Sequence, residues 1–439
     1  MPSFLVKTLG CKLNQLESES IIDAFFQRGF NLSGSNDTNP SIVVINTCTV
    51  TSKADQKARN AIRKALKDFP DSRVIVTGCY AQLDKDELQK LETDNKQRLF
   101  VVGKDKIISF LQNLSDLGTN KPDSLRASVP PCDNKTINQF EFNPSRFSAH
   151  TRSFIKIQDG CDKQCTYCRI RLARGPSISL ETDEILSRLK VLEQNYTEAV
   201  ISGVNICQYR GENGQDLAGL LDYLLKGTKK IALRLSSLEP DYIDENLVKV
   251  LSDKRIRPHF HLSIQSLNKK ILERMGRSYN AQTVKNAIAL LRSAKESPFL
   301  ACDIIAGFPG ETKTEFNETY KTCKELNFAW IHVFPFSRRP GTKAFEFSDN
   351  IKESEVTKRV KIITDLAEQG RAEYVRSWLG REVDVLVEKS GKYCKGITEN
   401  YLKVQINTKE KFPPPGTVLK CRLTEEGNYK DYAVKAIII

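Results

Sequence analysis

The stretch that decides the fold spans residues 159–169 and reads Asp159-Gly-Cys161-Asp-Lys-Gln-Cys165-Thr-Tyr-Cys168-Arg169. Three thiols, spaced C-x3-C-x2-C, lie within eight residues, and a loop this short can bend each sulfur toward a common point. A 4Fe-4S cube usually takes four cysteine thiolates, so three leave one iron open to a substrate. The triplet therefore predicts an iron-sulfur cluster with one open corner.

Zinc is the main competing interpretation of the triplet. A structural zinc site needs four closed nitrogen or sulfur ligands, typically as two separated pairs. The next cysteine is Cys207, and histidines stand only at 150, 259, 261 and 332. Zinc is therefore disfavoured, and buried or fortuitous thiols remain the other alternative.

The triplet, with Tyr167 before its last cysteine, resembles the cluster motif of the radical S-adenosylmethionine (SAM) enzymes. The resemblance implies that SAM binds the open iron through its amino and carboxylate groups and receives one electron at its sulfonium. The product would be a 5'-deoxyadenosyl radical, which abstracts an unactivated hydrogen. The cofactor supplies the difficult chemistry, while the protein orients it and excludes side reactions.

Composition describes a chain of 439 residues, which is long enough for two or three domains. No stretch reaches the roughly 18 uncharged apolar residues of a membrane helix, and the first residues lack the features of a signal peptide. We therefore expect a cytoplasmic protein, without a membrane, whose twelve cysteines are reduced and available to metals. The net charge of +13 favours a polyanionic partner, although a basic solvated surface explains it equally well.

Residues 1–115 predict a parallel sheet, because strand, loop and helix patterns repeat along them. The expected strands span 4–8, 42–46, 73–77 and 99–102. The expected helices lie near 15–28, 52–67, 84–92 and 105–114. Cys11, Cys48 and Cys79 each follow one of the first three strands by one to three residues. Open parallel sheets bind ligands at the carboxyl edge, so these thiols can converge there, unless they are three unrelated half-buried thiols.

The residues around these thiols resemble the N-terminal domain of the methylthiotransferases. The matching segments are Thr8-Leu-Gly-Cys11-Lys-Leu-Asn14, Asn46-Thr-Cys48-Thr-Val-Thr51 and Thr77-Gly-Cys79-Tyr-Ala-Gln82. The resemblance implies that Cys11, Cys48 and Cys79 hold an auxiliary 4Fe-4S cluster, whose free iron carries the sulfur to be inserted. It implies that a second 4Fe-4S cluster, which generates the radical, is held by Cys161, Cys165 and Cys168.

Residues 116–146 lack periodicity and predict a linker, in which Cys132 is expected to be a bystander. The strand and helix alternation returns in residues 147–378, and its six βα units fit the partial barrel that the resemblance implies. Barrel chemistry lies at the carboxyl ends of strands, so the cluster loop after the first strand lies on that face. The expected strands span 154–157, 198–202, 231–236, 259–264, 300–305 and 330–334, and a helix near 352–378 closes the segment.

Small and polar residues follow the later core strands and can offer hydrogen bonds to a ribose and an amino acid. In register with the cluster they resemble the SAM-binding segments of the family, and Met275-Gly-Arg277-Ser-Tyr279 resembles its M-x-R-x-Y motif. An ordinary turn explains Gly307 as well, and a helix cap explains Ser236. The predicted SAM contacts are Gly203, Asn205, Ser236, Gln265 and Gly307.

The basic run Arg169-Ile-Arg171-Leu-Ala-Arg174 directly follows the third cluster ligand. It is either a solvated charge run or a contact for a substrate phosphate or the SAM carboxylate. The chain departs from the family pattern at Arg171, at Pro176 and over residues 267–270. These departures concern the contacts around the substrate and not the clusters.

Residues 379–439 alternate like short strands between glycine and proline turns, which predicts a small all-β barrel. This barrel resembles the RNA-binding TRAM domain that ends these enzymes. The four histidines and the remaining cysteines are expected to be structural; these cysteines are Cys207, Cys302, Cys323, Cys394 and Cys421.

The segments around Cys11 and Cys48 look most like those of the threonylcarbamoyladenosine tRNA methylthiotransferases. The resemblance implies that a methylthio group is added to C2 of N6-threonylcarbamoyladenosine at position 37 of tRNA, with two SAM. It also implies an electron donor such as flavodoxin or ferredoxin, and a sulfur source. A C-H between two ring nitrogens is not acidic enough for a side-chain base, so a radical route is reasonable. The target is a loop base, which a protein reaches without opening a duplex.

Three alternatives stay open. The same chemistry could act on isopentenyladenosine-37 tRNA or on a ribosomal protein aspartate. The chain could instead be a non-catalytic RNA-binding iron-sulfur sensor. A two-cluster electron carrier is disfavoured, because both clusters lack a fourth cysteine.

Overall fold

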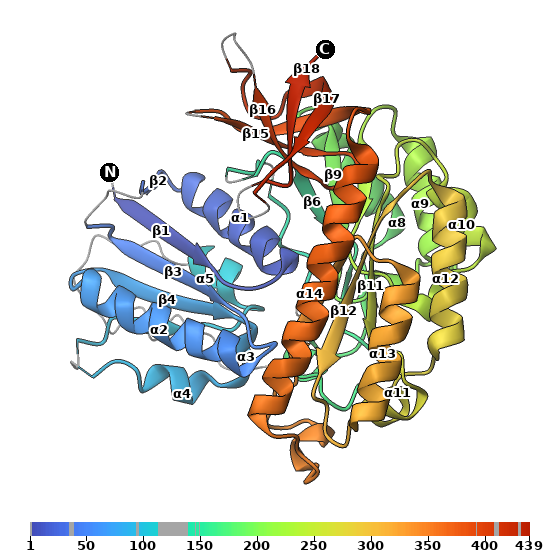
Figure 1. Cartoon of the computed structure of the whole chain (residues 1–439). Helices are drawn as coiled ribbons and strands as arrows, with labels where there is room; N and C mark the ends of the chain where they lie inside the picture. Colours follow the sequence, from blue (N-terminus) through green and yellow to red (C-terminus); the bar gives the residue numbers. More distant parts are fainter. Residues whose placement is uncertain are drawn as a thin grey trace.

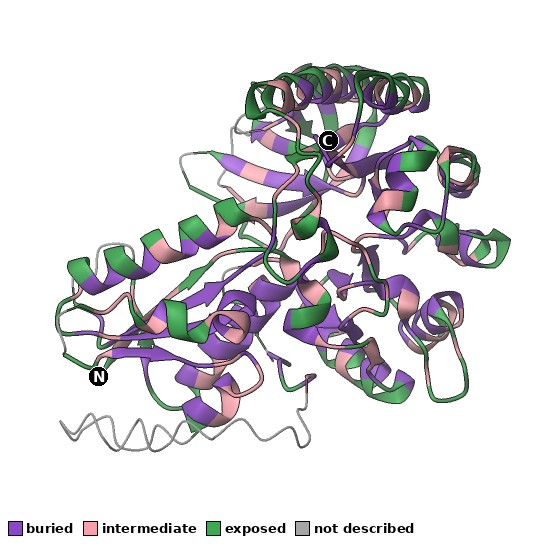
Figure 2. Cartoon of the chain, turned by 90° about the horizontal axis from the view of Figure 1, so that it is seen from below, coloured by how far each residue is buried: buried purple, intermediate pink, exposed green. Residues whose placement is uncertain are grey.

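The computed structural model describes residues 2–34, 39–93, 96–112, 139–144, 146–148, 150–391, 393–407, 412–428 and 432–439. Residues 116–138 of the predicted linker, with Cys132, lie outside these ranges. Figure 1 shows the described residues arranged as an N-terminal sheet with its helices, a central core and a C-terminal barrel. In Figure 2 the outer faces of the helices are exposed and their inner faces are buried.

The N-terminal body is a five-stranded sheet in the order β2-β1-β3-β4-β5, and every pair in it is parallel. The central strand β3 is buried along its whole length, as expected for a parallel strand with helices on both faces. Its strands are β1 (Ser3–Thr8), β2 (Asn31–Leu32), β3 (Ile42–Thr47), β4 (Arg73–Gly78) and β5 (Leu99–Val101). Its helices are α1 (Lys12–Phe26), α2 (Ser52–Asp68), α3 (Cys79–Leu83), α4 (Lys85–Gln89) and α5 (Ile107–Gln112).

The four predicted strands of this sheet are confirmed, and three details differ: strand β2, helix α3, which begins at Cys79 before the helix expected near 84–92, and the start of α1. Strand β2 was not predicted, because two residues are too few to display an alternating pattern. Helix α1 begins at Lys12, three residues before the expected start, because Cys11 takes the extended backbone of an N-cap. This places a predicted cluster ligand directly at a helix start.

The core contains six parallel strands in the order β6-β9-β10-β11-β12-β13, open between β6 and β13. Two single bridges, Leu233 to Ile256 and Leu238 to Leu262, connect the two halves of this sheet. The strands are β6 (Ser153–Lys156), β9 (Glu198–Ser202), β10 (Ala232–Leu235), β11 (His259–Gln265), β12 (Phe299–Ala306) and β13 (Trp330–Pro335). The predicted partial barrel is therefore confirmed strand by strand.

Helices surround this core on its outer side (Figure 1). They are α8 (Thr182–Glu193), α9 (Leu217–Gly227), α10 (Glu245–Leu251), α11 (Lys269–Met275), α12 (Ala281–Ala294), α13 (Lys313–Leu326) and α14 (Glu353–Trp378). Three single turns of 3-10 helix are η1 (Ile206–Gln208), η2 (Pro240–Tyr242) and η3 (Lys343–Glu346). Helix α1 of the N-terminal body lies against β6, and its Leu16 joins the apolar cluster of the core.

A short antiparallel ladder of β7 (Gln158–Asp159) and β8 (Ile178–Ser179) was not predicted. Between these two strands run the predicted cluster loop and the one-turn helix α7 (Ile170–Arg174). The ladder holds together the two ends of a segment that has little other regular structure. It therefore fixes where the loop leaves the core and where it returns.

The C-terminal body is a closed five-stranded barrel in the order β14-β15-β16-β18-β17, as predicted. Cys394 and Cys421 are completely buried in its apolar cluster, in agreement with a structural role. Its strands are β14 (Glu382–Lys389), β15 (Cys394–Thr398), β16 (Lys403–Asn407), β17 (Val418–Glu426) and β18 (Val434–Ile438). The barrel contacts the core where the core strands begin: Arg152, before β6, binds Glu388 at 2.9 Å.

Tyr401, between β15 and β16, is the point where all three bodies meet. Its ring centroid lies 4.0 Å from that of His259 and 5.1 Å from the guanidinium of Arg234, both in the core. The ammonium of Lys12 from the N-terminal body lies 5.9 Å from the same ring. Burial raises the pKa of Tyr401, but Lys12, Arg152 and Arg234 outweigh burial and bring it below its ordinary value. Tyr401 therefore stabilises a group of buried cations.

We expect Tyr401→Ala to lower the free energy of unfolding by roughly 2–3 kcal/mol, because a half-buried aromatic ring is removed and its cations lose their partner. Urea denaturation and limited proteolysis of the C-terminal barrel measure this loss. Tyr393→Ala is the matched control, since Tyr393 lies in the same barrel and is 50% exposed. Equal losses in the two variants would show that Tyr401 does not connect the bodies.

Candidate iron-sulfur and SAM site

Gln158 organises the base of the cluster loop. Its amide nitrogen donates to the carbonyl oxygens of Asp159 at 2.9 Å and Gly160 at 2.8 Å, and its Oε1 accepts the N–H of Asn205 at 2.9 Å. Gln158 was not predicted as a site residue. The only available signal was a polar side chain at the end of a buried strand, directly before the thiol triplet.

Gly160 allows the loop to turn tightly against the segment that returns from it. Its φ is +70°, and a Cβ on it would collide with the carbonyl oxygen of Pro176. The N–H of Cys161 donates to the carbonyl of Gly175 at 3.1 Å on the same returning segment. Pro176, where the chain departs from the family pattern, therefore meets the loop through its backbone and leaves the cluster loop intact.

The M-x-R-x-Y segment holds the far end of the same loop. The N–H of Thr166 donates to the carbonyl of Met275 at 3.0 Å. Arg277 binds the hydroxyl of Tyr167 at 3.0 Å and a carboxylate oxygen of Glu239 at 2.6 Å. All of these contacts are within the protein, so the segment positions the residues between Cys165 and Cys168.

Cys161, Cys165 and Cys168, called here the radical trio, are all half-buried. Burial, together with the neighbouring Cys165 and Cys161, raises the pKa of Cys168 to about 12. The backbone N–H of Ile170 lies 3.4 Å from Sγ of Cys168 and favours the thiolate in return. The three sulfurs thus lie near one another, and solvent can reach each residue.

The structure also brings together Cys11, Cys48 and Cys79, called here the auxiliary trio, from three strand ends. A Cβ on Gly10 would lie 2.7 Å from Cβ of Cys48, so the first two loops touch. Burial, together with the nearby Cys11 and Cys79, raises the pKa of Cys48 to about 12. The convergence predicted from the parallel sheet is therefore present.

The two trios suit a cluster better than a single ion. Among the described residues, no three His, Cys, Asp or Glu side chains are placed to hold one metal ion. The thiolates of a 4Fe-4S cube bind different irons, so their sulfurs lie farther apart than the ligands of one ion. The donor set of three thiols at each trio fits a cube with an open iron.

Two of the predicted SAM contacts have buried polar atoms that lack a hydrogen-bond partner within the described part of the chain. They are the side-chain amide of Asn205 and the hydroxyl of Ser236. Asn205 is 5% exposed and lies beside Cys161, whose raised pKa it lowers slightly against the effect of burial. Buried polar atoms are normally satisfied, so these two groups fit a polar ligand next to the radical trio.

The other three predicted contacts have different surroundings. A Cβ on Gly203 would lie 2.9 Å from Oε1 of Gln158, so this glycine makes room for the side chain that organises the loop. A Cβ on Gly307 would lie 2.5 Å from Val356 on α14, which agrees with the alternative of a strand-to-helix turn. Gln265 has a φ of +69°, a strained conformation at the carboxyl end of β11.

Both interpretations of the basic run are wrong for two of its three arginines. Arg169 and Arg174 are 8% and 3% exposed and bind carboxylates of the protein, so neither is solvated or free for a substrate phosphate. Arg169 binds Asp84 of the N-terminal body at 3.0 Å. Only Arg171 is exposed. The run therefore attaches the loop after the radical trio to the N-terminal body.

Arg174 reaches the auxiliary trio itself. Its Nε lies 3.3 Å from Sγ of Cys79, its Nη1 lies 3.1 Å from both carboxylate oxygens of Asp159, and its Nη2 lies 2.9 Å from Oε1 of Glu17. Arg174 is six residues after Cys168, which in a helix corresponds to about 9 Å along the axis. The two trios are therefore separated by little more than α7 and one guanidinium.

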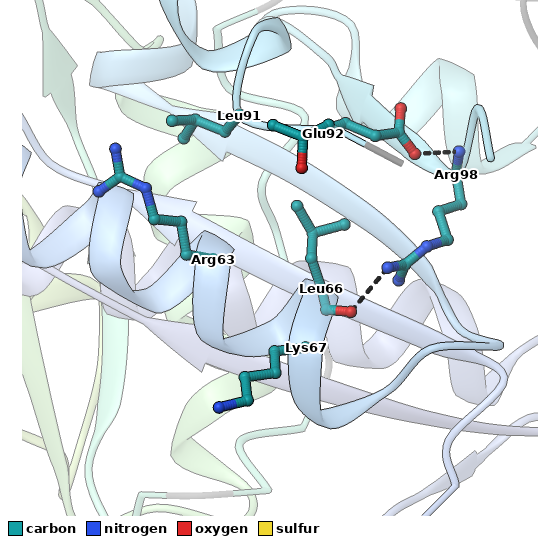
Figure 3. A pocket seen from close by; sticks show the side chains of 7 residues that line it. Arg63, Leu66, Lys67, Leu91, Glu92 and Arg98 are labelled. Atoms are coloured by element: carbon teal, nitrogen blue, oxygen red, sulfur yellow. Dashed lines mark hydrogen bonds between the residues drawn. The ribbon is translucent and has the colours of Figure 1, made fainter. Parts of the chain in front are cut away.

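A surface pocket of about 300 Å³ lies on the N-terminal body, between α2 and the segment that precedes β5 (Figure 3). Arg98, which precedes β5, donates to the carbonyl of Leu66 near the end of α2, and both residues line the pocket. No thiol lines the pocket, so it is separate from both trios. It is lined by Arg63, Leu66, Lys67, Leu91, Glu92, Thr93 and Arg98.

Comparison with known proteins shows to which family the chain belongs. Residues 3–101 match the "Uncharacterized protein family UPF0004", and residues 155–323 match the radical SAM superfamily. A relative from Treponema pallidum, named threonylcarbamoyladenosine tRNA methylthiotransferase MtaB, is 39% identical over 92% of this chain and 95% of its own. The chain belongs to the radical SAM methylthiotransferase family. Such enzymes use SAM and a 4Fe-4S cluster, in agreement with the radical trio.

Further relatives place the chain in the MtaB-like part of this family. The MtaB of Bacillus subtilis is 32% identical over 97% of this chain and 95% of its own. A tRNA-2-methylthio-N(6)-dimethylallyladenosine synthase from Cronobacter sakazakii is less similar, with 29% identity over 90% of this chain and 84% of its own.

A solved structure confirms the fold class. The apo form of the cobalamin-dependent SAM radical enzyme OxsB superposes with a TM-score of 0.53 at 13% identity, covering 82% of this chain and 56% of that chain. Among the residues described, no helix combines the length and the apolar composition that crossing a bilayer requires.

We expect Gly160→Ala to bind about four fewer iron atoms per chain after anaerobic reconstitution, because the displaced loop cannot hold one 4Fe-4S cube. Iron analysis and visible absorbance measure the loss. Gly214→Ala is the control, since Gly214 has a φ of +74° but its Cβ would meet nothing within 4 Å. It carries the same backbone strain of about 1–2 kcal/mol without the collision, so its iron should be unchanged. A full iron content in Gly160→Ala would contradict this account of the loop.

Proposed function

We propose that the chain is a cytoplasmic enzyme that adds a methylthio group to C2 of N6-threonylcarbamoyladenosine at position 37 of tRNA, using two SAM and two 4Fe-4S clusters. The observation that carries this proposal is the contact between Arg174, from the loop of the radical trio, and Cys79 of the auxiliary trio. Two thiol trios at such a short separation suit a reaction that needs a radical and a sulfur at the same substrate atom. The names of the relatives support the choice of nucleoside.

Each group of residues has a role in this proposal. Cys161, Cys165 and Cys168 hold the radical-generating cluster, and Cys11, Cys48 and Cys79 hold the sulfur-carrying one. When bound, the first cluster with SAM would supply the 5'-deoxyadenosyl radical, and the second cluster would supply the inserted sulfur. Gln158 and Arg277 keep the cluster loop in place.

SAM would be held on the same face of the core. Asn205 and Ser236 offer it their unsatisfied polar atoms, Gln265 lies at the end of β11, and Gly203 and Gly307 shape the backbone around it. Between the trios, the side chains of Arg174, Glu17 and Asp159 are at most 2% exposed, and such a dry contact would help to protect a radical from side reactions.

The partners follow from the same chemistry. We propose a division into residues 1–115, 116–146, 147–378 and 379–439, with the last segment as a TRAM-like domain that binds the tRNA. An electron donor such as flavodoxin or ferredoxin would reduce the cluster of the radical trio. A separate sulfur source would restore the auxiliary cluster.

Iron content tests the number of clusters. We expect about eight iron atoms per reconstituted chain and about four in Cys48→Ala and in Cys165→Ala, since each variant loses one cube. Cys48→Ala should still form 5'-deoxyadenosine from SAM, whereas Cys165→Ala should not. Cys207→Ala is the control, because Cys207 is buried in the apolar core and should leave eight irons in place. A wild-type value near four would remove the second cluster and the mechanism with it.

Nucleoside mass spectrometry tests the substrate. We expect tRNA from a strain without this gene to lose 2-methylthio-N6-threonylcarbamoyladenosine and to retain N6-threonylcarbamoyladenosine. The wild-type gene should restore the product, and the Cys48→Ala gene should not. Loss of the isopentenyladenosine derivative instead would assign the other tRNA substrate. No change in tRNA, together with no cleavage of SAM by the reduced protein, would favour a non-catalytic sensor.

A further inference from the structure

Arg174 belongs to a buried network that spans the N-terminal body and the core. Lys104 and Glu17 come from the first, and Lys156, Asp159 and Arg174 from the second. Nζ of Lys156 lies 2.5 Å and Nζ of Lys104 lies 3.5 Å from Oδ2 of Asp159. The side chains of all five are at most 6% exposed, so these contacts are shielded from water.

The network has three basic groups and two carboxylates, so its described members leave basic charge in excess. Buried charges are costly unless a partner of opposite sign compensates them. The Sγ of Cys79 accepts from Nε of Arg174 at 3.3 Å and is the remaining acceptor of this guanidinium. A thiolate at Cys79, as a cluster ligand is, supplies the missing negative charge.

The geometry of the guanidinium leaves it little freedom. Asp159 occupies Nη1 and Glu17 occupies Nη2, so the Nε–H is directed at the sulfur. Oδ1 of Asp159 also accepts the N–H of Gly160 at 2.8 Å, one residue before Cys161. A chain of hydrogen bonds therefore joins Cys79 to the start of the radical trio.

We propose that Arg174 is a positioning residue for the sulfur-carrying cluster: it holds the Cys79 corner with a charge-assisted hydrogen bond and raises the reduction potential of that cluster. Hydrogen bonds to ligand sulfurs tune the potentials of iron-sulfur clusters. A cationic donor stabilises the more negatively charged, reduced state, so its loss makes reduction harder. This inference rests on the proposed function, because it requires a cluster at the auxiliary trio.

The test uses the full chain with Cys161→Ala, Cys165→Ala and Cys168→Ala, which leaves the auxiliary cluster alone. In this parent, a redox titration followed by electron paramagnetic resonance gives the midpoint potential of that cluster. We expect the midpoint to be most positive in the parent, lower with Arg174→Lys and lowest with Arg174→Gln. Lysine keeps the charge but cannot reproduce the planar fork, and glutamine loses both.

Arg339→Lys is the matched control in the same parent. The side chain of Arg339 is 2% exposed and also joins the core to the N-terminal body, through Asp55 at 2.6 Å and Thr49 at 2.7 Å. In the described part of the chain, its side chain donates to oxygens of Ser52, Thr49 and Asp55 and to no sulfur. Arg339→Lys should weaken the contact between the two bodies without moving the midpoint potential of the auxiliary cluster.

The outcomes are distinct. A parent that holds no iron after reconstitution overturns the proposed function, and this inference with it. A parent with about four irons whose midpoint is unchanged by Arg174→Lys overturns this inference alone. An equal shift in Arg339→Lys also overturns it, because the effect would then come from loosened bodies. If Arg174→Gln cannot hold a cluster, Arg174→Lys, which keeps the charge, still decides between these results.

Discussion

The placement of the two trios depends on buried ion pairs between the N-terminal body and the core. Arg174 binds Glu17 and Asp159 binds Lys104 across this boundary, and Arg339 with Asp55 forms a further contact of the same kind. Removing one partner of a buried pair typically costs about 3–5 kcal/mol, so the two bodies have one strongly preferred arrangement. Apolar contacts alone would let the two bodies shift against each other. The paired charges hold the bodies in place and so fix the distance between the two trios.

Much of the architecture could be predicted because local patterns carry it. Apolar runs of four to eight residues marked the strands of both sheets, and all six core strands were found at the expected positions. The convergence of Cys11, Cys48 and Cys79 followed from one topological rule, since parallel strands end at the same edge. The thiol spacing of the radical trio needed no tertiary information at all.

The residues that were missed act through contacts that no local pattern encodes. Arg174 could be taken for one member of a solvated basic run, because its two carboxylate partners do not lie near it in the sequence. Glu17 belongs to the N-terminal body, and Asp159 lies on the other side of the cluster loop. Tyr401 lies in a short connection between strands, and only the packing of the three bodies shows that its ring contacts the core and the cation of Lys12. The role of Gly307 was ambiguous for a related reason: its neighbour Val356 is 49 residues later in the chain.

The C-terminal barrel meets the core where the core strands start, whereas the radical trio lies beyond the end of β6. Strand β6, which has four residues, extends over about 13 Å. If the C-terminal barrel binds the tRNA as proposed, the nucleic acid follows the flank of the core over at least this length. The core would then set a minimum length for the bound RNA, since a short hairpin can present the correct base and still fail to reach the C-terminal barrel.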